Sequence, residues 1–210
     1  MKRMKHRGLF FLILLIAGTG SLHAQERDDF GIWQSIDIRA GSAGKWSGGL
    51  WFEHRSKGNA RTLDCAVVMP YVSFQATPHL LLDYASEYIV ALSGNYISCR
   101  PSVTLLLGEG PLSFSLRELP IYEHSFATGT GYWTLRTRGK VTYALPDTKL
   151  KPYLSCELFT RRHWEKTRYY IGSTWSPGKH STLNLFYMYY VMAGMSNQRH
   201  ILGLGYAFKI

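Results

Sequence analysis

Basic and acidic side chains recur through this sequence at positions that alternate with large apolar residues. In the clearest case Arg136, Arg138 and Lys140 occupy every second position between Leu135 and Val141. Residues two apart lie on the same face of a β-strand, so these three cations form one row. Such a row can pair with carboxylates or attract anionic solutes. The same alternation places the following charged residues on polar strand faces: Asp37, Glu53, Arg55, Asp83, Glu87, Arg100, Arg117, Arg136, Arg138, Lys140, Glu157 and Arg168.

Histidine is the other side chain here that could do chemistry, because it can act as a general base for a nearby hydroxyl nucleophile. Ser125 follows His124, and Ser196 is close to His200, but neither pair forms a recognised nucleophile motif. We therefore assign no catalytic residue and keep a lipid-modifying hydrolase as the alternative function. That alternative would gain support if a histidine, a serine and a carboxylate converged at one rim of the fold. The histidines near predicted strand ends are His54, His124, His163 and His200.

The sequence contains no motif for a cofactor or a metal ion. Gly203 and Gly205 lie in a strand pattern with no helix after them, which excludes a dinucleotide-binding turn. Cys65, Cys99 and Cys156 are far apart and lack metal-type spacing, and an odd number cannot all pair within one chain. Each cysteine alternates with apolar neighbours, so we expect all three to face outward as small apolar side chains. A disulfide is the alternative.

Apolar and polar residues alternate with a period of two through most of the chain, and no segment has the period of a helix. The alternating stretches are about 10 to 14 residues long, whereas strands in globular proteins average about 5 to 6 residues. Tilted strands of this length can cross the hydrocarbon core of a membrane. The predicted strands are 28–40, 45–56, 62–76, 80–92, 96–107, 112–125, 132–145, 150–161, 166–176, 182–192 and 199–210.

These strands predict an all-β fold, an antiparallel transmembrane β-barrel of the outer-membrane type with ten to twelve strands. We count eleven, but single-chain bacterial barrels have an even number of strands, so ten is preferred. Charged residues are expected to face the lumen, because an arginine or lysine at the lipid mid-plane costs about 2 to 4 kcal/mol. A soluble lipocalin-like barrel or β-sandwich would have the opposite arrangement. The mean hydropathy of −0.12 fits alternating faces.

The first 24 residues have the pattern of a secretory signal peptide. Four basic residues precede an apolar run at 9–17, which is too short to span a bilayer as a helix. We expect cleavage near Ala24, which leaves 25–210 as a single barrel domain; an uncleaved anchor is the alternative. Removing the four leader cations from the formal net charge of +10 leaves +6. Because these charges are scattered and the chain is exported, we expect no nucleic-acid partner.

The chain ends in HILGLGYAFKI, in which large apolar residues alternate with small or polar ones up to Ile210. This ending looks like the signal that the outer-membrane barrel-assembly machinery recognises, with Ile210 in place of the more usual phenylalanine. We therefore expect that machinery and outer-membrane lipids as partners. Tight turns such as GSAG and PDTK follow the odd-numbered strands, and the other connections are mostly longer. Because barrels have short periplasmic turns, we expect the C-terminus in the periplasm.

Four stretches carry a resemblance to a known family: DFGIWQSIDI, KLKPYLSCELF, KTRYYIGSTW and HILGLGYAF. Together they resemble an uncharacterised outer-membrane family of Gram-negative bacteria, domain of unknown function twenty-four-ninety. The resemblance spans 29–210, and KLKPYLSCELF at 149–159 is its most distinctive part. It implies a β-barrel of the outer membrane with no established activity, and it supplies no functional residues.

The expected lumen contains charges of both signs, and arginine is the most frequent of them. A barrel of about ten strands is narrow enough for side chains largely to fill its interior. We therefore expect either a packed plug of arginine–carboxylate pairs with a structural role, or a narrow pore or pocket that weakly favours anionic solutes. The solute, the oligomeric state and the choice between plug and pore stay open at this level.

Overall fold

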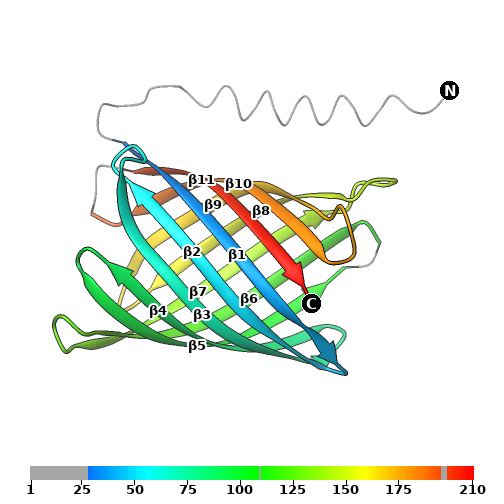
Figure 1. Cartoon of the computed structure of the whole chain (residues 1–210), viewed down its shortest axis with the longest axis horizontal. Coiled ribbons are helices and arrows are strands. Elements are labelled where there is room, and N and C mark those ends of the chain that lie inside the picture. Colours follow the sequence, from blue (N-terminus) through cyan, green and yellow to red (C-terminus); the bar gives the residue numbers. More distant parts are fainter. Residues whose placement is uncertain (1–27, 109, 195–197) are drawn as a thin grey trace.

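The computed structural model describes residues 28–108, 110–194 and 198–210. The predicted signal peptide and Ser196 lie outside these residues. Within them the chain forms eleven β-strands that close into one barrel (Figure 1). None of the described residues form a helix long and apolar enough to cross a membrane. The strands are β1 (Asp29–Ala43), β2 (Trp46–Lys57), β3 (Thr62–Thr77), β4 (Leu80–Ala91), β5 (Gly94–Leu107), β6 (Leu112–Ser125), β7 (Gly131–Tyr143), β8 (Leu150–Thr160), β9 (Trp164–Trp175), β10 (Ser181–Met192) and β11 (Arg199–Lys209).

The barrel closes by pairing β1 with β11 in parallel, whereas consecutive strands of the described chain pair antiparallel. The parallel register runs from Asp29 opposite Arg199 to Arg39 opposite Lys209, and the two strands lie side by side in Figure 1. When an odd number of strands alternate in direction, the first and last run the same way, so the closing pair has to be parallel. The count of eleven strands is therefore confirmed, and the expected even number, with ten preferred, is wrong.

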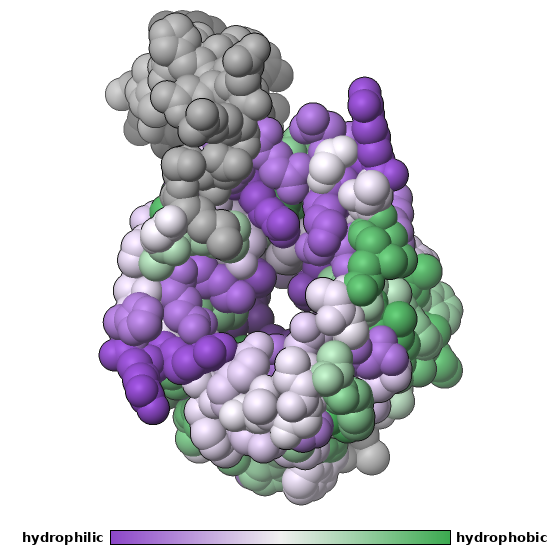
Figure 2. All heavy atoms as spheres, turned by 90° about the vertical axis from the view of Figure 1, so that its left-hand side faces the viewer, coloured by the Kyte–Doolittle hydropathy of each residue, from purple (hydrophilic) through white to green (hydrophobic). Residues whose placement is uncertain are grey.

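The two faces of the strands differ as expected for a membrane barrel. On the outside Tyr84, Leu185 and Leu204 are 49%, 55% and 48% exposed, whereas Glu87 on the inside is 5% exposed. Figure 2 shows apolar residues on the flanks of the barrel and hydrophilic residues around the opening at one end. A soluble barrel or sandwich would bury the aliphatic side chains instead. The predicted all-β barrel of the outer-membrane type is confirmed.

A small apolar cluster fills the interior beside β1, β10 and β11. Phe186 packs against this cluster, and a Cβ added to Gly203 would lie 1.9 Å from an atom of the Phe186 ring. Position 203 therefore needs a glycine for the ring to stay where it is. The small residues of the terminal strand thus make room on the inner face, while Leu202 and Leu204 face outward. The cluster consists of Trp33, Met188, Tyr190 and Ile201.

The connections at the two ends of the barrel have similar lengths. Those after odd-numbered strands and those after even-numbered strands both range from two to six residues. The expected contrast between short turns and longer loops is therefore wrong. The cause is that β2 ends one residue later than predicted and β5, β7 and β9 begin one or two residues earlier, which shortens the connections after even-numbered strands. The periplasmic position of the C-terminus stays a prediction, without support from loop length.

The cysteines only partly follow the predicted outward pattern. Cys99 and Cys156 are exposed on the outer face, whereas Cys65 is buried and lies on the inner face together with Val67. All three cysteines are free thiols in the described chain. The prediction that all three cysteines face outward is therefore wrong for Cys65. The described chain contains no disulfide between these cysteines, so that alternative is not supported.

A β-bulge explains why Cys65 faces inward. Arg55 of β2 pairs with Cys65 of β3, but the next residue, Ser56, pairs with Leu63, so Asp64 is an extra residue in β3. One extra residue shifts the alternation of side chains by one position. Leu63 therefore stays outside while Cys65 turns inward beside Arg55. Hydrophobicity alone could not reveal this, because both faces are apolar at this point.

Glu118 is a carboxylate on the outer face near the middle of β6. It pairs with Val103 of β5 and with Thr137 of β7, and directly opposed residues lie on the same face of a sheet. Val103 is exposed to the outside, as is Leu116 two residues before Glu118. The Glu118 carboxylate accepts a hydrogen bond of 2.9 Å from the Thr137 hydroxyl. The expectation that strand charges face the lumen therefore has an exception, which a neighbouring hydroxyl partly compensates.

We expect the substitution Glu118→Leu to stabilise the barrel in lipid. The outward carboxylate lies in the apolar belt, and its removal should raise the free energy of unfolding by about 1 to 2 kcal/mol, less than the value for an arginine or lysine. The measurement is urea unfolding in lipid vesicles, followed by tryptophan fluorescence. Val103→Leu is the matched control, because it changes an outward neighbour without changing charge. A less stable E118L barrel would contradict the lipid-facing position.

Candidate functional site

Two cavities lie inside the barrel. The larger has a volume of about 700 Å³, and every charged residue that the sequence predicts to face inward lines it, from Asp37 to Arg168. The smaller has a volume of about 150 Å³ and is lined by Glu123, Arg161 and Glu165, close to the connections after β6 and β8. The charged face of the strands and the internal cavity are therefore the same surface.

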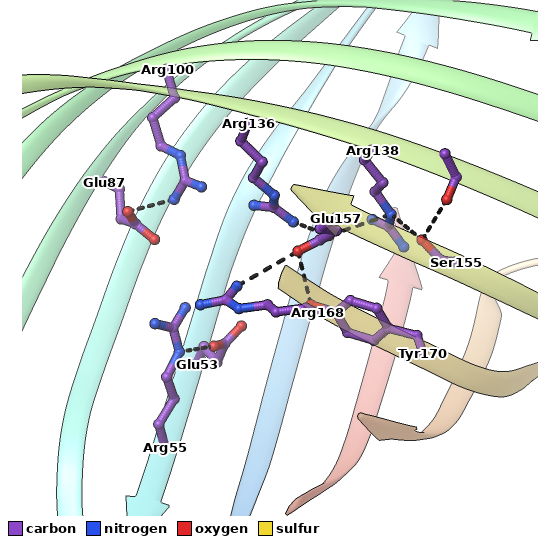
Figure 3. Close-up of polar contacts among 11 residues, drawn as sticks. Glu53, Arg55, Glu87, Arg100, Arg136, Arg138, Ser155, Glu157, Arg168 and Tyr170 are labelled. Carbon is purple, nitrogen blue, oxygen red and sulfur yellow. Dashed lines mark hydrogen bonds and ion pairs between the residues drawn. The ribbon is translucent and has the colours of Figure 1, made fainter. Parts of the chain in front are cut away.

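Four arginines separate the two cavities, and we call them the arginine layer. Arg55, Arg100, Arg136 and Arg168 line both cavities, as does Glu87. They come from β2, β5, β7 and β9, so they reach the lumen from different sides of the wall. Figure 3 shows their side chains extending toward the interior. Any solute that moves between the two cavities has to pass these guanidinium groups.

Glu157 of β8 is the carboxylate with the most partners in this region. It is 1% exposed and forms an ion pair with Arg136. The Nε atom of Arg138 lies 3.4 Å from its Oε1 atom, and Nη1 of Arg168 lies 3.6 Å from Oε2. The hydroxyl of Tyr170 donates a hydrogen bond of 2.9 Å to the same Oε2 (Figure 3). One buried carboxylate thus balances part of the charge of three arginines.

The sheet register explains this cluster. Glu157 lies directly opposite Arg138 of β7 on one side and Arg168 of β9 on the other. Directly opposed side chains on one face of a sheet are about 4.5 to 5.5 Å apart at Cβ, within reach of an ion pair. Arg136 is two residues from Arg138 and therefore shares that face. Pairing between strands, and not spacing along one strand, brings the three arginines to one carboxylate.

The other two arginines of the layer each pair with one carboxylate. Arg100 forms an ion pair with Glu87, whose Oε2 atom also accepts a hydrogen bond of 3.1 Å from the Ser98 hydroxyl. Arg55 forms an ion pair with Glu53 two residues before it on β2. Charge-assisted pairs of this kind offset the cost of burying ions only when the geometry is favourable and further hydrogen bonds are present. The layer is therefore held in place by partners on its own wall.

Further polar groups continue from the layer into the larger cavity. Arg117 lies 3.6 Å from Asp83, and its Nε atom donates a hydrogen bond of 3.0 Å to the Ser102 hydroxyl. Lys140 has its amino group 3.9 Å from the centre of the Tyr153 ring. A cation over an aromatic face keeps its charge available to solutes, because the ring carries no formal negative charge. The row Arg136–Arg138–Lys140 thus extends along one wall of the larger cavity.

Cations outnumber carboxylates on the described cavity walls. Ten arginine and lysine residues line the two cavities, against seven aspartate and glutamate residues, so three positive charges are in surplus. The sequence analysis did not single out several of these residues, although Lys166 shares a face with Arg168 through the same two-residue spacing. The two-residue spacing therefore indicated Lys166, but the alternation is harder to recognise there because Lys166 lies near the end of a strand. The residues missed in this way are Arg39, Glu123, Arg161, Glu165 and Lys166.

Aromatic rings hold Arg168 in place, which the sequence did not indicate. Its guanidinium carbon lies 4.7 Å, 4.9 Å and 5.0 Å from the ring centres of Phe159, Tyr190 and Trp33. The same Trp33 ring lies 4.4 Å from the guanidinium carbon of Arg55. Arginine stacks on aromatic faces in this way without losing its charge. Phe159 and Tyr190 come from β8 and β10, the two strands paired with β9, whereas Trp33 comes from β1, so only closure of the barrel brings the Trp33 ring to Arg168.

The histidines do not form a serine-based site in the described chain. His200 faces outward, where its Nε2 atom lies 3.3 Å from Asp28 and its Nδ1 atom 2.5 Å from the Tyr187 hydroxyl. No described histidine makes a hydrogen bond to a serine, and Ser125 instead accepts a bond of 3.4 Å from the backbone N–H of Thr128. A carboxylate, a histidine and a phenol therefore meet at one rim. The described residues also hold no group of three potential metal ligands.

The closed barrel, its apolar exterior and its charged interior define an outer-membrane-type β-barrel. The chain belongs to the family described as "Protein of unknown function (DUF2490)", whose family model matches residues 30–200. This confirms the resemblance seen in the sequence. Among solved structures, the chain is similar to one described as "NanC porin structure in rhombohedral crystal form", with 12% identity and a TM-score of 0.53. That match covers 77% of this chain and 85% of the porin chain, and no curated protein matches the sequence.

We expect Glu157→Gln to destabilise the barrel strongly. The substitution leaves the buried Arg168 and the half-buried Arg136 and Arg138 without their common carboxylate, and breaking a buried ion pair costs about 3 to 5 kcal/mol. Denaturant unfolding in lipid vesicles measures the change. Glu165→Gln is the matched control, because Glu165 pairs with the partly exposed Arg161 at 3.0 Å, where a loss of less than about 1 kcal/mol is expected. An E157Q barrel as stable as the wild type would refute the central role of Glu157.

Proposed function

We propose that this protein is an outer-membrane barrel whose lumen admits small solutes and favours those with negative charge. The observation that carries the proposal is the position of the arginine layer, at the junction of the two cavities. A surplus of cations along an aqueous path lowers the energy of an anion there and raises that of a cation. Figure 2, in which hydrophilic residues surround an opening at the end of the barrel, supports access from solvent.

The walls of the larger cavity add to the preference for anions. Lys140 has an aromatic ring as its neighbour, and Arg117 forms an ion pair with Asp83 at 3.6 Å. Lys140 thus has no carboxylate partner in the described chain, and the three arginines around Glu157 share a single carboxylate. Low-dielectric walls also focus the field of these cations into the lumen. An anion entering the larger cavity meets this field before it reaches the arginine layer.

The location and assembly of the protein belong to the same proposal. A signal peptide cleaved near Ala24 would direct the chain across the inner membrane, and residues 25–210 would form the single barrel domain. The terminal strand, with its alternating apolar face, would be read by the barrel-assembly machinery, and outer-membrane lipids would surround the exposed aliphatic residues. The similarity to a protein described as a porin supports passage of solutes as the role, by fold alone.

We expect purified protein in planar bilayers to conduct with a preference for chloride over potassium. In a KCl gradient the reversal potential should indicate a chloride-to-potassium permeability ratio on the order of two to ten. A tenfold ratio corresponds to a free-energy difference of about 1.4 kcal/mol between the two ions. The double variant Arg117→Gln, Lys140→Gln should reduce it. Lys45→Gln is the control, because Lys45 lies in the turn between β1 and β2. If the folded barrel does not conduct, the proposed pore function is refuted and the structural role remains.

The hydrolase alternative has one observation in its favour, the contact of Asp28, His200 and Tyr187 at one rim. A histidine held by a carboxylate can accept a proton from a hydroxyl group. Against it, the hydroxyl here is a phenol that faces outward among aromatic rings. We expect no lipase or deacylase activity above that of the His200→Gln variant when both are assayed on phospholipid and lipopolysaccharide. Activity that H200Q lacks would establish the alternative.

A further inference from the structure

The arginine layer surrounds a space that its own carboxylates do not occupy. In Figure 3 the guanidinium groups of Arg55, Arg100, Arg136 and Arg168 extend toward a common space, with Arg100 and Arg136 on one side of it and Arg55 on the opposite side, while Glu87 and Glu157 flank it. All four arginines line both cavities, so the space between them is open to solutes from either side. Like charges gathered in this way repel one another, and an anion between them would relieve that repulsion.

Most N–H donors of the arginine layer have no carboxylate partner in the described chain. Each guanidinium carries five N–H donors. In the described chain, the carboxylate partners of the layer are Glu53 for Arg55, Glu87 for Arg100, and Glu157 for both Arg136 and Arg168. Glu157 is also shared with Arg138. Five arginines thus face three carboxylates, which leaves two positive charges and most N–H groups available to a ligand.

The guanidinium groups are held rigidly enough to form a site. Arg55 and Arg168 stack on the Trp33 ring, and Arg136 has its guanidinium carbon 5.3 Å from the centre of the Phe159 ring. The Arg168 side chain is 10% exposed and that of Arg100 is 12% exposed. Binding therefore orders little that is not already ordered, so less of the interaction energy is lost to entropy.

We propose that the space within the arginine layer is a binding site for one oxyanion, the carboxylate or phosphate group of a small solute. The planar fork of arginine matches both groups in a bidentate arrangement. The cavity volumes orient the ligand: about 150 Å³ on one side holds only a small group, and about 700 Å³ on the other holds the body of the solute. The proposal rests on the proposed function only in that the ligand reaches the site through the lumen.

Trp33 provides a direct signal for binding, because its ring contacts two arginines of the layer. We expect titration of the detergent-solubilised barrel with sodium phosphate, and separately with sodium acetate, to change tryptophan fluorescence saturably at constant ionic strength. Sodium chloride serves as the reference. The stronger of the two titrations identifies the group the site prefers. A response that only follows ionic strength, equal for all three salts, would overturn the oxyanion site.

Variants separate a built site from general attraction of anions. Arg100→Gln should weaken oxyanion binding about tenfold, and Arg100→Lys, which keeps the charge but loses the fork, should also weaken it. Arg117→Gln is the matched control, because Arg117 lines the larger cavity outside the layer. Circular dichroism and heat-modifiable mobility confirm that each variant is folded. Equal weakening by R117Q and R100Q, or unchanged binding in folded R100K and R100Q, would refute the site.

The same measurements distinguish this site from the proposed pore. Chloride-selective conductance without saturable oxyanion binding would leave the pore intact and remove the site. Saturable binding to a barrel that does not conduct would leave the site intact and remove the pore. In a conducting barrel, phosphate or acetate bound in the layer should reduce the chloride current in wild type more than in R100Q.

Discussion

A β-sheet in a membrane has no water to satisfy the backbone groups at its edges, so every strand needs a partner on both sides. In this protein the requirement is met by the parallel pairing of β1 with β11, which extends over eleven residue pairs. The odd number of strands is possible only because of that pair. Once the sheet is closed, each strand has one face toward lipid and one toward the lumen, and the distribution of charge follows from this geometry.

The closed sheet confines strongly charged side chains to a narrow space, where they would be costly without partners. Glu157 shows how the cost is reduced, because one carboxylate contacts three arginines and a tyrosine hydroxyl. The compensation is incomplete, since cations remain in surplus on the cavity walls. The same groups that replace a hydrophobic core thus create an interior that is favourable for anions. Structure and proposed function depend on one set of residues.

Much of the fold could be derived from the sequence because the direction of a side chain on an extended strand is a local property. The predicted strand 112–125 coincides with β6 (Leu112–Ser125), and the charged residues predicted to face inward line the larger cavity. Local alternation failed where strands interact. Cys65 turned inward because β3 carries an extra residue against β2, and Glu118 lies outside with Thr137 as partner.

The sequence by itself determined that the chain consists of long alternating strands, where they lie, and which face of each carries charge. These features need only the two-residue repeat of the extended backbone. Only the tertiary structure decided that eleven strands close with a parallel pair, that Glu157 meets Arg136, Arg138 and Arg168, and that four arginines separate the two cavities. Those arrangements depend on the register between strands and on the diameter of the closed barrel, which no single strand contains.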